Sequence, residues 1–161
     1  MMMKSFEELL KGICGSPVSN NLLAFDPGET TGWAHFLNGT LHKAGEEPVP
    51  VEGEVLHGEG IGALMELYQP DTVVIEDYKI YASKAKPHTW NALYTPKLIG
   101  FIQAHAKRYT SDIVMQMASS KQFCTNDKLK AWGFYPKGNP HAADAVRHGC
   151  YFLLFHKRKR G

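Results

Sequence analysis

The stretch "LLAFDPGETTGWAHF", residues 22–36, joins two apolar runs through a Pro-Gly turn. The first run ends in a carboxylate, Asp26, and the second begins after Thr31-Gly32. A short, almost entirely apolar run such as residues 21–26 is typical of a buried strand. We therefore expect Asp26 to lie at the carboxyl end of a central strand, where a bare carboxylate needs a partner or a function.

The rest of the chain shows alternating strand and helix patterns. Ser5 and Glu8 have the spacing of a capping box and predict a short N-terminal helix within residues 5–14. Asn38-Gly39 is a strong signal for a hairpin turn, and Thr95-Pro96 resembles a helix start with proline in the first turn. We expect strands at 21–26, 31–37, 40–45, 71–77 and 112–117, a loop at 46–55, and further helices at about 61–68, 95–106, 119–131 and 141–156.

This order of elements predicts an α/β protein with a mixed sheet of five strands and helices on its faces. Right-handed crossovers would make the first, fourth and fifth strands parallel, with the second strand antiparallel. The expected spatial order is third, second, first, fourth, fifth. We expect one domain over residues 1–161, ending in a basic tail at 156–161.

Composition narrows the class of protein. No apolar run approaches the roughly 20 residues of a membrane span, and no signal-peptide pattern is present, so we expect a cytoplasmic protein whose three distant cysteines are reduced thiols. Residues 1–77 hold 3 Lys/Arg and 13 Asp/Glu, whereas residues 78–161 hold 15 Lys/Arg and 3 Asp/Glu. Such asymmetry is typical of nucleic-acid binding; an ordinary solvated face with a basic tail is the alternative.

Two acids are expected to meet at one edge of the sheet. If the first and fourth strands are adjacent and parallel, Asp26 and Glu76 end side by side at the edge where open α/β sheets bind ligands. Two carboxylates that close repel each other unless a cation lies between them. Carboxylate oxygens suit Mg²⁺ or Mn²⁺.

A third acid comes from "NPHAADAV", residues 139–146. His141 and Asp144 are three residues apart and share one face of the predicted helix. Asp144 could instead be an ordinary first-turn acid that the helix dipole favours. Taken together, Asp26, Glu76 and Asp144 fit a two-metal phosphodiester site.

Three blocks, "FDPGETTGWA", "VVIEDY" and "HAADAVRHG", resemble the motifs of RuvC-like Holliday junction resolvases, which belong to the RNase H-like (retroviral integrase) superfamily. The resemblance spans residues 20–155, and the compact length is similar to that of bacteriophage members. It implies that Asp26, Glu76, His141 and Asp144 bind two Mg²⁺ ions, for which Mn²⁺ substitutes. Many relatives have Asp where His141 stands.

Lys121 loosely matches the lysine that family members place after the fifth strand. Lys128 or Lys130 would be a second basic position, and whether Asp77 takes part stays open. The implied activity is that of a crossover junction endodeoxyribonuclease, which hydrolyses DNA phosphodiesters with metal-activated water. Resolution of a four-way junction by paired nicks implies a homodimer, acting in the host bacterial cytoplasm if the protein is phage-encoded.

Aromatic and basic side chains follow the fourth strand and are expected to bind branched DNA by stacking and phosphate contacts. A tyrosine packed into the core is the alternative. The candidate DNA-binding residues are Tyr78, Lys79, Tyr81, Lys84, Lys86 and Lys128.

Three other functions are weighed against junction resolution. Sugar kinases and actin-like ATPases also place Asp and Gly after a first strand, but they need two such domains and more phosphate loops than 161 residues supply. A related nuclease acting on flaps or forks fits the same motifs. A catalytically inactive DNA-binding relative would have no reason to keep three acids together.

Overall fold

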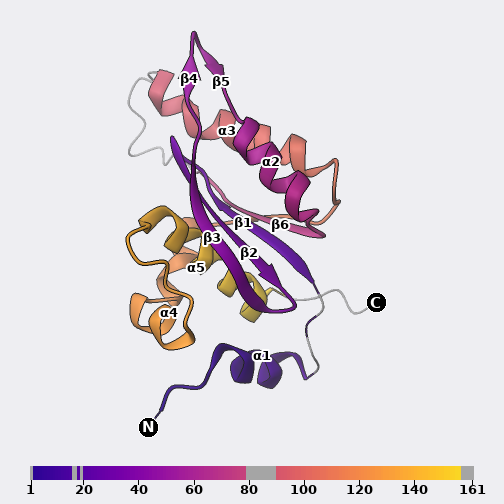
Figure 1. Cartoon of the computed structure of the whole chain (residues 1–161), viewed down its shortest axis with the longest axis vertical. Helices are drawn as coiled ribbons and strands as arrows, with labels where there is room; N and C mark the ends of the chain where they lie inside the picture. Colours follow the sequence, from indigo (N-terminus) through magenta and orange to yellow (C-terminus); the bar gives the residue numbers. More distant parts are fainter. Residues whose placement is uncertain (1, 16–17, 19, 79–89, 157–161) are drawn as a thin grey trace.

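The computed structural model describes residues 2–15, 18, 20–78 and 90–156, and a five-stranded mixed sheet lies at its centre (Figure 1). The strand order is β3-β2-β1-β6-β7. β1 pairs antiparallel with β2 and parallel with β6, and β6 pairs parallel with β7. This confirms the expected order and directions. The strands are β1 (Asn21–Asp26), β2 (Thr30–Leu37), β3 (Thr40–Pro48), β6 (Thr72–Glu76) and β7 (Ile113–Gln116).

Helices cover both faces of the sheet. Figure 1 shows α2 and α3 on one side and α5 with α4 on the other, while α1 lies beyond the end of the sheet on the α5 side. None of the described helices is long and apolar enough to cross a membrane. The helices are α1 (Phe6–Cys14), α2 (Glu59–Tyr68), α3 (Trp90–Ala106), α4 (Asn126–Trp132) and α5 (Pro140–Phe155), with a 3₁₀ helix, η2 (Ala118–Phe123).

The central strand β1 is buried on both faces. Leu23 and Phe25 belong to the core beneath α2 and α3, while Leu22 and Ala24 belong to the core beneath α5. Because side chains alternate along a strand, Asp26 continues the row that faces α5.

Two local sequence signals, a hairpin turn and a helix cap, are confirmed. Asn38 and Gly39 both have positive φ, 51° and 79°, as a two-residue hairpin turn between β2 and β3 requires. The Ser5 hydroxyl accepts from the Glu8 N–H, and the Glu8 carboxylate accepts from the Ser5 N–H, so the capping box at the start of α1 is complete.

The expected loop at 46–55 is wrong. β3 runs on to Pro48, because the long strand β2 offers backbone partners up to Thr30. The chain then forms a small hairpin of β4 (Val51–Glu52) and β5 (Val55–Leu56). Gly53 and Glu54 both have positive φ at its turn, a conformation that glutamate rarely adopts and that the sequence therefore does not suggest.

The expected helix start at Thr95-Pro96 is also wrong. α3 begins at Trp90 and carries Pro96 inside it. Tyr94, one turn into the helix, is buried, and its hydroxyl donates to the Val49 carbonyl. This turn packs against the segment around Val49, which stabilises the helix before Pro96. Local preference alone would place this proline in the first turn.

The expected helix at 119–131 is two elements. η2 ends at Phe123, and α4 begins after Thr125, whose side chain accepts from the Lys128 N–H as an N-cap. The break arises from this cap. It turns the segment, so that η2 lies along α5 near the end of the sheet.

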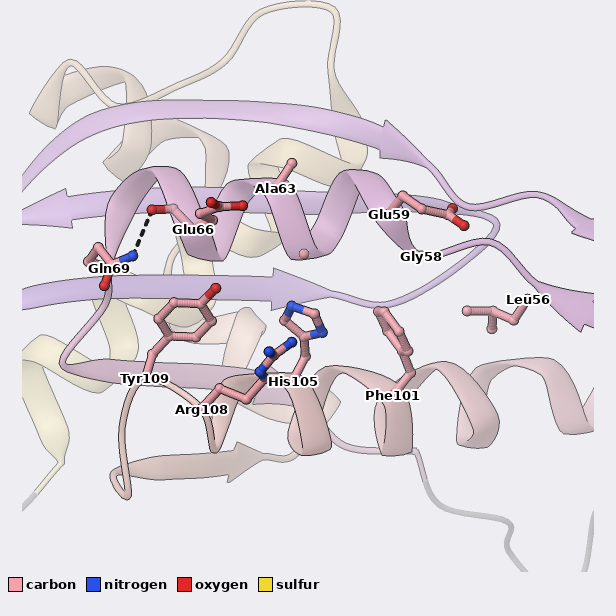
Figure 2. Close-up of a pocket in the computed structure, with 11 residues that line it drawn as sticks. Leu56, Gly58, Glu59, Ala63, Glu66, Gln69, Phe101, His105, Arg108 and Tyr109 are labelled. Carbon is pink, nitrogen blue, oxygen red and sulfur yellow. Dashed lines mark hydrogen bonds between the residues drawn. The ribbon is translucent and has the colours of Figure 1, made fainter.

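An open pocket of about 730 Å³ lies between α2 and α3 on the face opposite α5 (Figure 2). Phe101 and His105 line it from successive turns of α3, and Tyr109 lines it from the turn that follows the helix. Gly58, which caps α2, and Gly62 within α2 let this aromatic row approach, since a Cβ on them would lie 2.3 Å from the Phe101 ring and 3.0 Å from the His105 ring. The pocket is separated by the sheet from the face that carries Asp26.

Candidate active site

Asp26 and Glu76 end neighbouring parallel strands. In the register of β1 and β6, Phe25 lies opposite Ile75, which brings the next residues, Asp26 and Glu76, side by side. Both belong to the rows that face α5, and their side chains are only 13% and 15% exposed. The opening motif thus places a partly buried carboxylate beside a second one.

The motif Thr31-Gly32 lets α5 approach this edge of the sheet. A Cβ on Gly32 would lie 1.8 Å from the His141 carbonyl oxygen, so the first turn of α5 rests on the bare backbone of β2. Ala142 and Ala145 are buried and small, which permits the same approach from the side of the helix. The close contact brings His141 and Asp144 toward the two strand-end acids.

Gly32→Ala is expected to destabilise the protein by at least the roughly 1–3 kcal/mol typical of overpacking. The added methyl group meets helix backbone, which cannot move aside as a flexible side chain can. Gly100→Ala on α3 is the matched control, because a Cβ there meets nothing within 4 Å; it should stabilise the helix by about 0.5–1 kcal/mol. Urea denaturation measures both, and equal effects would contradict the packing argument.

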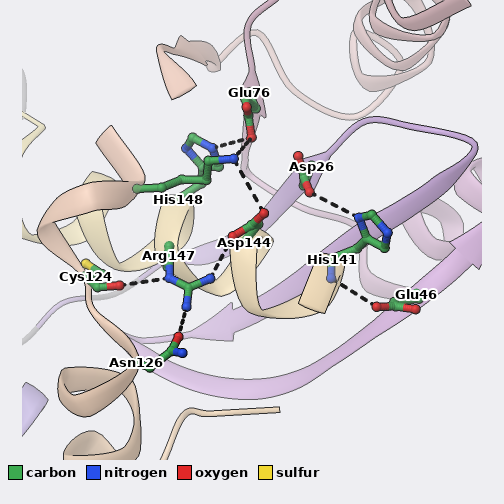
Figure 3. Close-up of polar contacts among 10 residues, drawn as sticks. Asp26, Glu46, Glu76, Cys124, Asn126, His141, Asp144, Arg147 and His148 are labelled. Carbon is green, nitrogen blue, oxygen red and sulfur yellow. Dashed lines mark hydrogen bonds and ion pairs between the residues drawn. The ribbon is translucent and has the colours of Figure 1, made fainter. Parts of the chain in front are cut away.

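Asp144 lies in the second turn of α5. The helix begins at Pro140 and has no acid in its first turn. The helix dipole acts mainly within the first turn, so it does not explain the position of Asp144. Instead, Asp144 lies 3.5 Å from the Lys121 ammonium and forms an ion pair with Arg147 (Figure 3). We call Asp26, Glu76 and Asp144 the acidic cluster.

Lys121 from η2 bridges two members of the acidic cluster. Its Nζ lies 3.1 Å from Glu76 Oε2 and 3.5 Å from Asp144 Oδ2. Burial would lower the pKa of Lys121, but attraction to Glu76 and Asp144 raises it above its ordinary value. The ammonium therefore stays charged and offsets part of the repulsion between the acids.

His141 contacts the cluster from the start of α5. Its Nδ1 lies 3.7 Å from Asp26 Oδ2, and its ring is 49% exposed. The backbone N–H of His141 donates to Glu46 Oε1 of β3 at 3.0 Å, so a strand carboxylate caps the free N–H at the helix start. His141 is thus fixed at the backbone and open to solvent at the ring.

The two strand-end acids have opposite pKa shifts. Burial, a hydrogen bond with Glu76 and the negative charge of Glu76 raise the pKa of Asp26 to about 8, against the opposing effect of Lys121. Burial also works against ionisation of Glu76, but hydrogen bonds from His148 and Asp26, with the charges of His148 and Lys121, lower its pKa to about 2. The directions of the two pKa shifts place the proton of this pair on Asp26 and leave Glu76 ionised.

This pairing bears on whether a divalent cation fits. Within the described ranges, no three His, Cys, Asp or Glu side chains form a ready-made metal site. The positive charge beside the acids comes from the Lys121 ammonium and the Arg147 guanidinium, and the raised pKa of Asp26 leaves this carboxyl protonated. A divalent cation satisfies the same carboxylates, and three carboxylates with an imidazole nearby are the hard ligands that Mg²⁺ and Mn²⁺ accept. The donor set fits such an ion.

Two residues at this site were missed from the sequence. Arg147 Nη1 donates to Asp144 Oδ1 at 2.7 Å, and its other nitrogens donate to the Cys124 carbonyl and to Asn126 Oδ1. His148, fully buried, places Nε2 2.9 Å from Glu76 Oε2. Their spacing of three and four residues from Asp144 was the available signal, because such residues share a helix face.

Several residues predicted from the sequence are not joined to the acidic cluster. Lys128 Nζ lies over the Phe123 ring and donates to its carbonyl, and Lys130 lies over Tyr135. The Asp77 carboxylate accepts from the Tyr78 N–H, and Tyr78 itself is exposed near the acidic edge. The remaining candidates, Lys79, Tyr81, Lys84 and Lys86, lie outside the described residues.

Solved structures with the same fold are junction resolvases. RuvC of Thermus thermophilus in complex with a Holliday junction has a TM-score of 0.60 at 14% identity, over 84% of this chain and 93% of that one. The yeast mitochondrial Holliday junction resolvase Ydc2 has 0.53 at 14%, over 92% and 84%. The fowlpox virus resolvase with Holliday junction DNA has 0.50 at 13%, over 83% and 96%.

Sequence comparison adds no closer relative. No protein-family model matches the chain, and no curated protein is similar to it in sequence. The structural likeness nevertheless extends over most of each chain. The protein therefore has the fold of RuvC-like Holliday junction resolvases, as its three motifs predicted.

Proposed function

We propose that this chain is a divalent-metal-dependent endonuclease that resolves four-way DNA junctions by paired nicks, as a homodimer. The observation that carries the proposal is the convergence of Asp26, Glu76 and Asp144 with Lys121 at one open edge of the sheet. The fold in which this occurs is that of proteins solved with Holliday junctions bound.

Within this proposal the acidic cluster holds the cation, with His141 as a further ligand or proton carrier. Bound Mg²⁺ would supply Lewis-acid activation of water and stabilise the leaving oxygen. The half-exposed His141 ring is positioned to exchange protons with solvent. Lys121, which already contacts two of the acids, would shift toward the scissile phosphate and neutralise charge that builds there.

DNA would approach the edge of the sheet rather than a closed cavity. Tyr78 lies exposed two residues after Glu76, where it can stack on an unpaired base at the branch point. Lys128 and the basic residues that follow Tyr78 in the chain would contact phosphates. Because a four-way junction has two-fold symmetry, two protomers would each cut one strand.

The purified protein should nick four-way junctions in Mg²⁺ or Mn²⁺ and leave them intact in EDTA. Ca²⁺ should support binding without cleavage, because it is larger and less exacting in geometry. Four-way, three-way, flap and linear DNAs built from the same strands provide the test, and a cruciform plasmid reports paired nicks as linear product. Full cleavage in EDTA would refute the metal dependence.

The same panel separates the alternatives. A nuclease for flaps or forks would cut those substrates at least as fast as four-way junctions and would leave the cruciform plasmid mainly nicked. A catalytically inactive relative would shift junctions on a gel but cut no substrate in either metal.

A further inference from the structure

Within the described part of the chain, His148 is the fully buried side chain of α5 that hydrogen-bonds to the acidic cluster. We propose that His148 is a positioning residue, which fixes the orientation of the Glu76 carboxylate toward the cation site. This inference rests on the proposed function, because it assigns Glu76 to that site. The resolvase motifs did not predict a role for this position.

The hydrogen position on the His148 ring follows from its surroundings. Nε2 lies 2.9 Å from Glu76 Oε2, and an ionised carboxylate can only accept, so Nε2 carries the hydrogen whether or not the ring is charged. Nδ1 is buried without a hydrogen-bond partner among the described residues. Among the residues that the structure describes, the ring makes one hydrogen bond, to Glu76.

The backbone at His148 is tied to the sheet at the same level. The His148 carbonyl accepts from Gln116 Nε2 at 3.0 Å, and Gln116 lies opposite Glu76 in the pairing of β7 with β6. The next residue, Gly149, packs so closely that a Cβ there would lie 2.2 Å from the Phe36 ring. The imidazole is therefore held at a fixed height above Glu76 and cannot follow the carboxylate if it turns.

The contact leaves one oxygen of Glu76 for other partners. His148 Nε2 and Lys121 Nζ both approach Oε2, at 2.9 and 3.1 Å. Lys121 is a flexible ammonium on a long stem and would turn toward the phosphate in our proposal. His148 is then the donor that keeps Oε2 engaged and directs Oε1 away from the helix. Partners of this kind typically change metal affinity by about 10–100-fold when they are removed.

The test compares side chains that differ in reach. His148→Gln can place an amide N–H near the position of Nε2, whereas His148→Asn is also polar but too short to reach Glu76. His148→Met fills the space without a donor. We expect Mn²⁺ binding to the DNA-free protein, followed by electron paramagnetic resonance of free Mn²⁺, to weaken about tenfold or more in the Asn and Met variants and to be largely restored in Gln.

His35→Asn is the matched control. His35 is also buried and hydrogen-bonded, to Asn21 and His42, but it belongs to β2, and Asn21 lies at the opposite end of β1 from Asp26. The replacement of His35 should lower the melting temperature without changing Mn²⁺ affinity. This control separates the loss of any buried histidine from the loss of the His148–Glu76 contact. Circular dichroism reports folding, and the Asn–Gln pair keeps the comparison valid if the Met variant does not fold.

The outcomes for the two proposals differ. If wild type binds Mn²⁺ and cuts junctions but the Asn and Gln variants bind Mn²⁺ as tightly as wild type, the positioning role is overturned and the proposed function stands. If wild type neither binds Mn²⁺ nor cuts any junction, both fail. A weakened Asn variant with a restored Gln variant supports the role.

Discussion

Asp144→Asn is expected to abolish cleavage and to leave junction binding equal or tighter. The change is nearly isosteric, and it removes the negative charge that pairs with Lys121 and Arg147. If Asp144 ligates the cation, cleavage should fall by orders of magnitude, because water activation and leaving-group stabilisation are lost together. Binding responds in the opposite direction, since fewer acids repel the incoming phosphates.

Asp127→Asn is the matched control for this experiment. Asp127 is an exposed acid in the first turn of α4, favoured by the helix dipole but not part of the acidic cluster. It should lose only about 0.3–1 kcal/mol of stability and cut normally. Gel shifts in EDTA and cleavage in Mg²⁺ measure the two effects. An Asp144→Asn protein that cuts near the wild-type rate would remove the third acid from the mechanism.

Asp144 also shows what could be predicted from the sequence. Its place on α5, and those of Asp26 and Glu76 at strand ends, follow from short-range patterns of period two or 3.6. Parallel crossovers then set the two strand-end acids side by side. The close approach of α5 was expected from its alanines, but its dependence on Gly32 was not, because that contact joins residues far apart in the chain.

Other parts of the site have no local pattern. Lys121 contacts Glu76 from η2, which ends at Phe123 before Thr125 caps α4, whereas the sequence predicts one helix over 119–131. His148 looks like an interior residue in sequence, and only the tertiary contact shows that it meets Glu76. Contacts made between elements, rather than within them, are where prediction from the sequence fell short.

The charge asymmetry of the chain acquires a physical meaning at this site. The acidic first half supplies Asp26 and Glu76, and the basic second half supplies Lys121, Arg147 and His148, which contact Glu76 and Asp144. The two halves meet at the end of the sheet because β7 and α5 return to the β1–β6 edge. The basic side chains that donate to the acids therefore come from the same packed elements that bring the acids together.

Asp26→Asn is expected to raise stability and to abolish cleavage. In the folded protein the pKa of Asp26 is raised to about 8, first by burial and then by Glu76, from an ordinary value of 3.8. The folded state therefore holds this proton more tightly than the unfolded chain. Stability from this residue is fully present below about pH 4 and is lost as the pH rises toward about 8. Asparagine does not ionise, and its amide can donate to Glu76 as protonated Asp26 does.

The advantage of Asp26→Asn over wild type should accordingly grow with pH in EDTA. It should reach on the order of 5 kcal/mol near pH 9, or roughly 10–20 °C in melting temperature. Wild type should regain stability when Mg²⁺ is added, because the cation takes the place of the shared proton, and the variant should gain less.

Denaturation at about pH 5 and about pH 9, with and without Mg²⁺, measures this difference in stability, and junction cleavage measures the loss of activity. A stability difference that stays the same at both pH values would contradict the shared proton, and a variant that still cuts would take Asp26 out of the cation site. Wild type that loses stability with pH and recovers it with Mg²⁺ would instead indicate that the acids are kept together for the ion rather than for the fold.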